Sequence, residues 1–342
     1  MKVFRSMLVL FILVVSLPGW SQSIVDSEQF FKDENPLVVT LSTDLGSLLS
    51  GKIKEAYQPA IFACKHPDGS IISEVIKLNL RGHSRRTICN VPPIRLSFRN
   101  PTSPRLSSLR NLKLVSECKS GSDYEQYLLK EFFAYKIYNV LTEKSFRVRL
   151  LKITYEDNVG KKKPFTRNAF VIENVDALSK RIKCKELNNI KLNSESTDRE
   201  QMTIVNLFEY MIGNTDWSVP NNHNIKLLRL KKDSTALPYP IPYDFDYSGF
   251  VNADYAVPDE MMGIESVVER VYRGFPRTME ELEAGIAVFN KHKPAIDALI
   301  ANAELLSAYL KKDISSYVND FYKIINNSKE VKRIFIENAR KK

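Results

Sequence analysis

The chain has 342 residues, 44% of them hydrophobic and 10% aromatic, and carries a formal net charge of +10 at pH 7. This hydrophobic content is enough for a substantial core, in one large domain or two packed lobes. The positive charge is spread thinly, with residues 161–163 as the only lysine block, which indicates at most loose attraction to anionic surfaces. A nucleic-acid-binding protein is therefore not expected.

The first residues predict an export signal. Lys2 and Arg5 form a charged region, an apolar run follows over residues 7–17, and small residues near Ser21 suit a cleavage site. No later run approaches the ~20 apolar residues that a membrane-spanning helix needs. We predict a signal peptide over residues 1–21, the alternative being a retained anchor. The mature protein would then be exported, without a transmembrane segment, to the periplasm, the cell surface or the medium.

The cysteines are even in number, which in an exported protein predicts one or two disulfides. Their pairing cannot be read from the sequence. No CxxC pair exists and the four histidines are scattered, so a zinc site is not expected. The cysteines are Cys64, Cys89, Cys118 and Cys184.

The β-rich part of the chain begins after a polar segment, residues 22–35, which we expect to be a loosely held arm. Between residues 37 and 118 several runs are rich in β-branched and aromatic residues and are separated by turn residues. These runs read LVVTLS, QPAIFACK, SEVIKLNLRG, PPIRLSF and LRNLKLVSEC. We interpret residues 36–118 as one antiparallel sheet.

One helix is expected next, opening at Ser122. Ser122 and Glu125 have the spacing of a capping box, and apolar residues then recur at helical spacing. Glu131 falls on this apolar stripe, so it either pairs with a cation or reaches water at the edge of the stripe. Two more strands are predicted, within residues 146–157 and 165–174.

The remaining sequence predicts mainly helices. One helix follows a second capping-box pattern, Thr197 with Glu200, and ends at Gly213, where glycine suits a C-terminal cap. Two short strand-like runs come next, and a helical pattern then extends to the end of the chain. We divide the mature chain into a β-rich N-lobe, residues 36–175, and a helical C-lobe, residues 176–342.

Polar residues beside the two strand-like runs have the chemistry of a metal site. Asp216 and Asn224 precede the first run. Asp244 and Asp246 follow the second, so a hairpin would bring all four groups to one end. Their oxygens are hard ligands for Mg²⁺ or Mn²⁺, and an Asp can accept the proton of an attacking hydroxyl, as phosphoryl transfer requires. The alternative is that Asp216 only caps its turn. His223 is expected to pack or hydrogen-bond within this loop.

The segment DFDYSG also matches the start of an EF-hand calcium loop. The twelfth position is Tyr255, however, where an EF-hand requires a bidentate Glu. Three closely spaced prolines before Asp244 also exclude the helix that precedes such a loop. We therefore reject an EF-hand and leave a calcium ion in this loop as an open alternative.

The motifs GNTDW, HNIKLL and PYDFDYSG together resemble the catalytic core of atypical protein kinases, in particular the CotH kinase-like and HipA kinases. The resemblance implies that Asp216 is the catalytic aspartate and Asn224 a metal ligand. Asp244 or Asp246 would be the second metal ligand, and the sequence does not separate these two. The chain as a whole is also similar to exported, uncharacterised proteins of Bacteroidetes.

The first half matches the same resemblance in order. RGHSRR resembles an Arg-Gly-x-Ser element of CotH-like proteins, which implies that Arg81 and Ser84 bind the cofactor. Lys113 on a strand would meet the nucleotide phosphates, with Glu131 as its partner on the helix. The chain departs from the kinase pattern because it has no GxGxxG loop. The implied fold is an α+β, bilobal, protein-kinase-like fold with one helix inserted in the N-lobe.

The expected function is that of an exported kinase-like protein that transfers phosphate from ATP, with Mg²⁺ or Mn²⁺, to a Ser/Thr or other hydroxyl. The acceptor would be an unidentified protein or glycan. The alternative is a non-catalytic, kinase-like envelope or assembly protein that keeps the acidic loop as a structural metal or calcium site. The first is favoured because all five expected groups are present in order: Lys113, Glu131, Asp216, Asn224 and Asp244.

Overall fold

The computed structural model describes residues 26–50, 57–65, 69–81, 89–99, 104–188 and 190–341. The predicted signal peptide and Ser84 lie outside these residues. Within them, no helix has both the length and the apolar character needed to cross a membrane.

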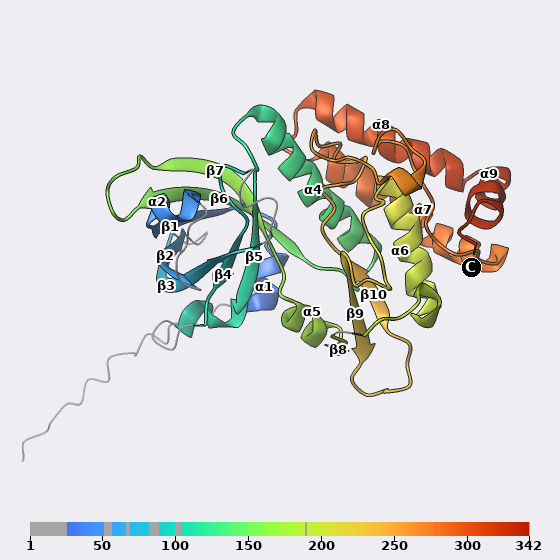
Figure 1. Ribbon diagram of the computed structural model, residues 1–342, viewed down its shortest axis with the longest axis horizontal. Coiled ribbons are helices and arrows are strands. Elements are labelled where there is room, and N and C mark those ends of the chain that lie inside the picture. The colour runs from blue at the N-terminus through green and yellow to red at the C-terminus, as the bar shows by residue number, and fades with distance from the viewer. Residues whose placement is uncertain are drawn as a thin grey trace, which may run out of the picture.

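Seven strands of the first half form a closed barrel (Figure 1). Neighbours around the barrel follow the order β1-β2-β3-β4-β5-β7-β6, and β6 returns to pair with β1 in parallel. All other neighbouring pairs in the barrel are antiparallel. The strands are β1 (Leu37–Thr43), β2 (Gln58–Lys65), β3 (Ile71–Leu80), β4 (Ile94–Ser97), β5 (Asn111–Ser116), β6 (Val148–Asp157) and β7 (Phe165–Ile172).

The barrel overturns the predicted bilobal, protein-kinase-like fold, which is wrong. A closed barrel is a different architecture from the kinase N-lobe, and the single antiparallel sheet expected over residues 36–118 is only one part of it. Closure comes from β1, whose Leu37 lies opposite Leu151 of β6 while its other edge pairs with β2. Because β1 is paired along both edges, the sheet has no free edge there.

An apolar core fills the barrel. Buried and exposed residues alternate along β3, as expected for a strand with one face turned to a core. Phe62 and Phe98 meet edge to face inside, with ring centroids 5.1 Å apart. The short helix α1 (Ser27–Lys32) adds Phe30 and Phe31 to the same core, and α2 (Leu45–Leu49) and the 3₁₀ helix η1 (Pro104–Leu109) also contribute to it.

The long helix α4 (Ser122–Leu141) lies between the barrel and the second half (Figure 1). Its residues belong to a second core cluster that includes outward-facing barrel residues such as Phe170. The predicted capping box is wrong, because Gly121 is the N-cap and provides no side-chain hydrogen bond. The Glu125 carboxylate instead accepts a hydrogen bond from Asn168 of β7 at 2.6 Å.

The second half combines a small sheet with helices. The sheet has the order β10-β9-β8. Helix α6 (Arg199–Ile212) has Gly213 as its C-cap, whose φ of 64° and ψ of 37° give the predicted left-handed conformation. Its N-cap is Asp198 rather than the predicted Thr197. The elements are α5 (Val175–Arg181), β8 (Cys184–Glu186), η2 (Ser194–Ser196), α6 (Arg199–Ile212), β9 (Ile225–Leu230), β10 (Tyr239–Pro242), η3 (Glu260–Met262), α7 (Met279–Ala301), α8 (Ala308–Ile325), α9 (Ser328–Lys332) and η4, a π-helix (Arg333–Glu337).

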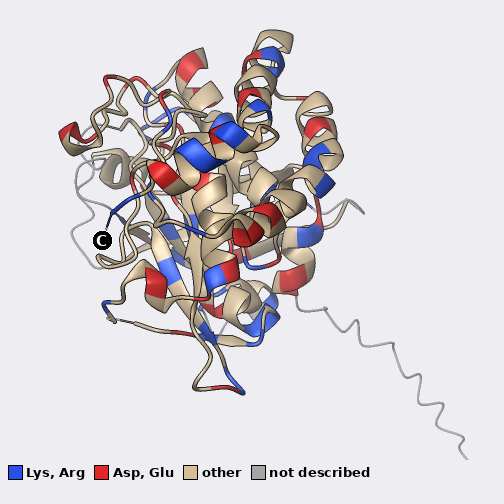
Figure 2. Cartoon of the chain, turned by 90° about the vertical axis from the view of Figure 1, so that its right-hand side faces the viewer, with Lys and Arg blue, Asp and Glu red and all other residues tan. Residues whose placement is uncertain are grey.

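The helical pattern expected after the second strand-like run is only partly present. Between residues 249 and 278 the described chain is irregular apart from η3, and α7 then runs without a break through Pro294. Arg270 holds the irregular segment by donating hydrogen bonds to the carbonyl oxygens of Met211 and Tyr317. Figure 2 shows acidic and basic residues interspersed along the chain on the helical side of the molecule.

The cysteines form one disulfide, between Cys89 and Cys118. Cys64 and Cys184 are buried free thiols. Burial raises the pKa of the Cys64 thiol to about 11, so it stays protonated at neutral pH.

Candidate active site

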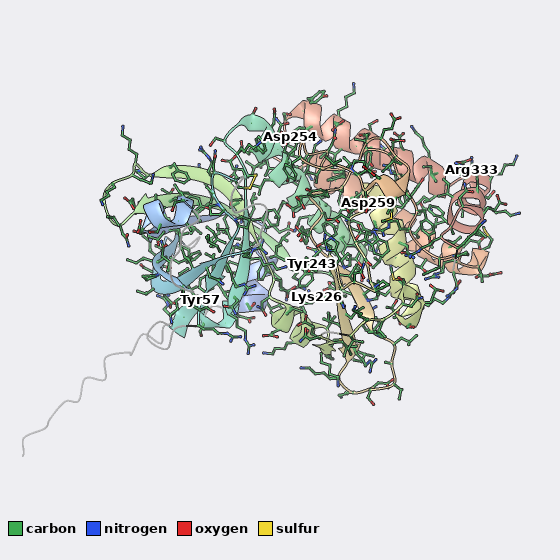
Figure 3. All side chains as sticks on the ribbon, viewed as in Figure 1. Tyr57, Lys226, Tyr243, Asp254, Asp259 and Arg333 are labelled. Carbon is green, nitrogen blue, oxygen red and sulfur yellow. A yellow bond between two sulfur atoms is a disulfide. The ribbon has the colours of Figure 1, made fainter. Side chains whose placement is uncertain are left out.

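The predicted hairpin is present and fixes one end of the site. β9 and β10 are antiparallel, with Ile225 opposite Pro242. One residue further, the backbone N–H of Tyr243 donates to the carbonyl oxygen of Asn224 at 3.0 Å. Asn224 and Asp244 therefore emerge from the same end of the hairpin. Figure 3 shows Tyr243 and Lys226 near the middle of the molecule, where the barrel meets this small sheet.

The turn after β10 is anchored by Phe245. Its ring is fully buried, with its centroid 4.6 Å from that of Tyr135 on α4 and 5.3 Å from that of Phe208 on α6. The Asp244 N–H donates to the Tyr135 hydroxyl at 2.8 Å and its φ is 69°, a conformation unusual for a non-glycine residue. Asp244 and Asp246, on either side of this anchored ring, therefore have fixed positions.

Three carboxylates from two distant segments converge beside this turn. Glu131 of α4, Asp244 and Asp246 each present an oxygen within 4.8 Å of the others, and we name these residues the acidic triad. Glu131 is 3% exposed and Asp246 5%, while Asp244 is half-buried. Like charges this close and this buried repel strongly, so the triad favours a nearby positive charge.

Two cationic side chains from the barrel lie in the field of Asp244. Burial, together with the charge of Arg81, lowers the pKa of Lys113 to about 8, and the charge of Asp244 opposes this change. Burial also lowers the pKa of the Arg81 guanidinium, against the effect of Asp244. The Lys113 ammonium lies 4.1 Å from the centroid of the Tyr243 ring. The predicted partnership of Lys113 with Glu131 stays a prediction.

Asp216 lies in the loop between α6 and β9, and its carboxylate is held at both oxygens. His223 Nε2 is 2.8 Å from Oδ1, and Asn224 Nδ2 donates to Oδ2 at 3.0 Å. Asn224 Nδ2 also lies 2.8 Å from the Asp216 carbonyl oxygen. The side-chain nitrogen of Asn224 is therefore engaged, and its amide oxygen is the side-chain atom that could bind a cation. His223 hydrogen-bonds within the loop, as predicted.

A buried network beneath Asp216 was not predicted. Asn214 accepts a hydrogen bond from the Asp216 N–H at 3.0 Å and donates to Glu209 Oε2 at 2.9 Å. Burial raises the pKa of Glu209 to about 8, against the hydrogen bond from Asn214. Arg273 donates to the carbonyl oxygens of Thr215 and Trp217. A charged residue inside the apolar run NLFEYMI was the only sequence signal for Glu209; Arg273 had none.

The two acidic segments are also tied to each other through the backbone. Gly249 N–H donates to the Gly213 carbonyl oxygen at 3.1 Å, and Phe250 N–H donates to that of Ile212 at 2.9 Å. Residues just before Asp216 are thus bonded to residues just after the acidic triad. The site is a single supported unit, built from the hairpin, α4 and the end of α6.

The chain matches no model of a known protein family and no curated protein.

Proposed function

We propose that the acidic triad binds a divalent cation and that the chain transfers a phosphate group from ATP to a hydroxyl acceptor. The observation that carries this proposal is the convergence of Glu131, Asp244 and Asp246 beside Lys113 and Arg81. Carboxylates for a cation, next to cations for phosphate oxygens, are the parts that phosphoryl transfer needs. The closed barrel gives no support from fold, so the proposal depends on the site alone.

The triad fits Mg²⁺ or Mn²⁺ by the nature of its donors. All three offer carboxylate oxygens, which are hard ligands, and the Asn224 amide oxygen is a fourth candidate from the end of the hairpin. A bound divalent cation would supply charge neutralisation to the phosphate oxygens.

Lys113 and Arg81 hold the phosphates in this proposal. With its pKa near 8, Lys113 is mainly protonated at neutral pH and can bind phosphate oxygens as a point charge. The neighbouring Tyr243 ring lies against the ammonium and limits where it can reach.

Asp216 positions the acceptor hydroxyl and takes its proton. The hydrogen bonds from His223 and Asn224 orient its carboxylate, and about 40% of its side chain remains exposed to an incoming acceptor. The network through Asn214 to Glu209 holds the backbone of this loop. Transfer then depends on how this carboxylate and the acceptor hydroxyl are oriented.

Burial of Glu131 and Asp246 favours a second candidate, a structural calcium site without catalysis. Calcium accepts six to eight oxygen ligands in flexible geometry, and carboxylates from α4 and the turn would then only fasten these elements together. The two candidates predict different stabilising ligands: a divalent cation together with ATP for phosphoryl transfer, and Ca²⁺ alone for the structural site.

The test measures thermal unfolding with Mn²⁺, Mg²⁺ or Ca²⁺, each with and without ATP, together with transfer of labelled phosphate to a mixed protein acceptor. Wild type is compared with Asp244→Asn and with Asp320→Asn, an exposed carboxylate on α8 that serves as the matched control. We expect Mn²⁺ with ATP to raise the unfolding midpoint of wild type and of the control but not of Asp244→Asn, because a ligand stabilises the state that binds it.

Asp216→Asn separates chemistry from binding. We expect it to keep the stabilisation by Mn²⁺ and ATP and to lower transfer by about 10²- to 10⁴-fold, the usual contribution of a positioned acid or base. Stabilisation by Ca²⁺ alone, with no effect of ATP in wild type, would exclude phosphoryl transfer and support the structural site.

A further inference from the structure

A cavity of about 790 Å³ lies away from the acidic triad, between the barrel and the start of the second half. It is lined by residues of α1, α5 and β8, together with Arg110 and Lys231. Figure 1 shows α1 and α5 close to each other beneath the barrel, and we name this space the α5 cavity. Neither the triad nor Lys113, Arg81 or Asp216 is among its described lining residues.

The acidic side chains of this wall are already engaged. Glu173 accepts from Arg181 at 2.7 Å, Asp176 from Arg110 at 2.6 Å, and Glu186 from Lys226 at 2.8 Å. The two other acids belong to α1: Glu28 pairs with Lys32 and Arg147, and Asp26 caps the first turn.

Three lysines of the same wall have no carboxylate partner among the ion pairs of the described chain: Lys180, Lys185 and Lys231. They come from α5, from β8 and from the end of β9. The wall therefore presents uncompensated positive charge from three separate elements, which favours an anion in the cavity.

Ser179 points to a specific ligand rather than diffuse attraction. It lines the cavity, is only 7% exposed, and its hydroxyl has no hydrogen-bond partner in the described structure. A buried hydroxyl without a partner is costly, and rotation of the Ser179 side chain toward the cavity would let a ligand oxygen satisfy it.

We propose that the α5 cavity is a second anion site, which binds a small phosphate-bearing molecule through Ser179, Lys185 and Lys231. Lysine ammonium groups bind phosphate as point charges, whereas the arginines that would suit a carboxylate, Arg110 and Arg181, are already committed to Asp176 and Glu173. This site is independent of phosphoryl transfer at the triad.

The test uses calorimetric titration with inorganic phosphate, against sodium chloride of matched ionic strength. We expect the double variant Lys185→Gln/Lys231→Gln to bind phosphate about tenfold more weakly than wild type, since each exposed charge contributes roughly threefold. The matched control, Lys161→Gln/Lys162→Gln, removes the same charge from the exposed β6–β7 loop and should bind as wild type does.

Ser179→Ala gives an independent reading. It removes a buried hydroxyl that lacks a partner, so we expect an unchanged or higher unfolding midpoint without phosphate and a roughly threefold weaker phosphate affinity. A residue with only a structural role would not separate these two quantities.

Lys113→Gln distinguishes the α5 cavity from the triad. We expect phosphate binding to persist in this variant. Wild-type affinity in the Lys185→Gln/Lys231→Gln variant, or loss of phosphate binding in Lys113→Gln alone, would overturn the proposal without affecting the proposed function of the triad.

Discussion

The barrel and the hairpin region, by which we mean the β9–β10 hairpin and the residues packed around it, bury different kinds of side chains. Inside the barrel, apolar side chains such as Phe62 and Leu41 dominate the core, and Glu74 is the single carboxylate that the described strands turn inward. Around the hairpin, buried carboxylates and amides lie next to buried aromatic rings. They include Glu131, Asn206, Glu209, Asn214, Asn224 and Asp246.

The backbone differs in the same way. Of the non-glycine residues with positive φ in the described chain, four lie between residues 222 and 252: Asn222, Asn224, Asp244 and Asn252. Backbone conformations of this kind cost free energy and persist where surrounding contacts enforce them, which is typical of functional sites. The difference indicates that the barrel is a rigid support. In the hairpin region, the polar arrangement and its backbone conformations lower the stability of the fold.

A pair of phenylalanine truncations tests this division most strongly. Phe245→Ala and Phe62→Ala each remove a fully buried ring, so both should lower the free energy of unfolding by about 3–5 kcal/mol. Only Phe245→Ala should also lose the stabilisation by Mn²⁺, because Phe245 separates and anchors two triad carboxylates. Urea unfolding with and without Mn²⁺ measures both effects. An equal loss of the metal response in Phe62→Ala would remove the distinction between the two regions.

Substitution of one glycine in each region tests how closely the two regions are packed. A Cβ at Gly249 would overlap the Val267 carbonyl oxygen and the Tyr317 hydroxyl, whereas a Cβ at Gly160, in the β6–β7 loop, meets nothing within 4 Å. We expect Gly249→Ala to lower the free energy of unfolding by about 3 kcal/mol through overpacking. Gly160→Ala should cost about 1 kcal/mol through its φ of 75° alone. Chemical denaturation of both variants gives the comparison, and equal costs would contradict it.

Glu209 should make the hairpin region sensitive to pH. Its folded pKa, raised to about 8 by burial, exceeds the ordinary value of 4.5, so its contribution to stability is complete below pH 4.5 and is lost as the pH rises toward 8. We expect this loss to approach about 1.4 kcal/mol per pH unit within that window. Glu209→Gln keeps an acceptor for Asn214 without a titrating proton, so its stability relative to wild type should increase from pH 5 to pH 8. Parallel pH profiles for the two proteins would contradict the assignment.

Local patterns in the sequence predicted the strands and the hairpin well. The runs assigned to β1–β7 are strands, and the β9–β10 hairpin lies between Asn224 and Tyr243 as the alternation and turn residues indicated. Barrel closure depends on β1 pairing with β6, more than a hundred residues away. No local pattern encodes such a parallel partner, and the kinase-like fold that the resemblance implied in its place is wrong.

The N-cap of α6 shows why the exact start of a helix is hard to predict when two neighbouring residues can both cap it. Thr197 and Asp198 are both good N-cap residues, and the structure uses Asp198 because its side chain reaches the Gln201 N–H. At the site, the unusual position of Glu131 on an apolar stripe was a readable signal. Tyr135 was not, since a tyrosine on that stripe looks like core until its hydroxyl is seen to accept from Asp244.

Lys113 lies where the two regions meet, because barrel strand β5 delivers it to the ring of Tyr243. With a pKa of about 8, it is protonated below that pH and neutral above it, so its attraction for phosphate should fall as the pH rises through 8. We expect the dissociation constant for ATP with Mn²⁺ to increase by up to about tenfold per pH unit above pH 8. Lys113→Arg keeps a positive charge over this range and should flatten the profile. The same pH dependence in both proteins would show that the barrel supplies only support and that phosphate is held entirely by the hairpin region.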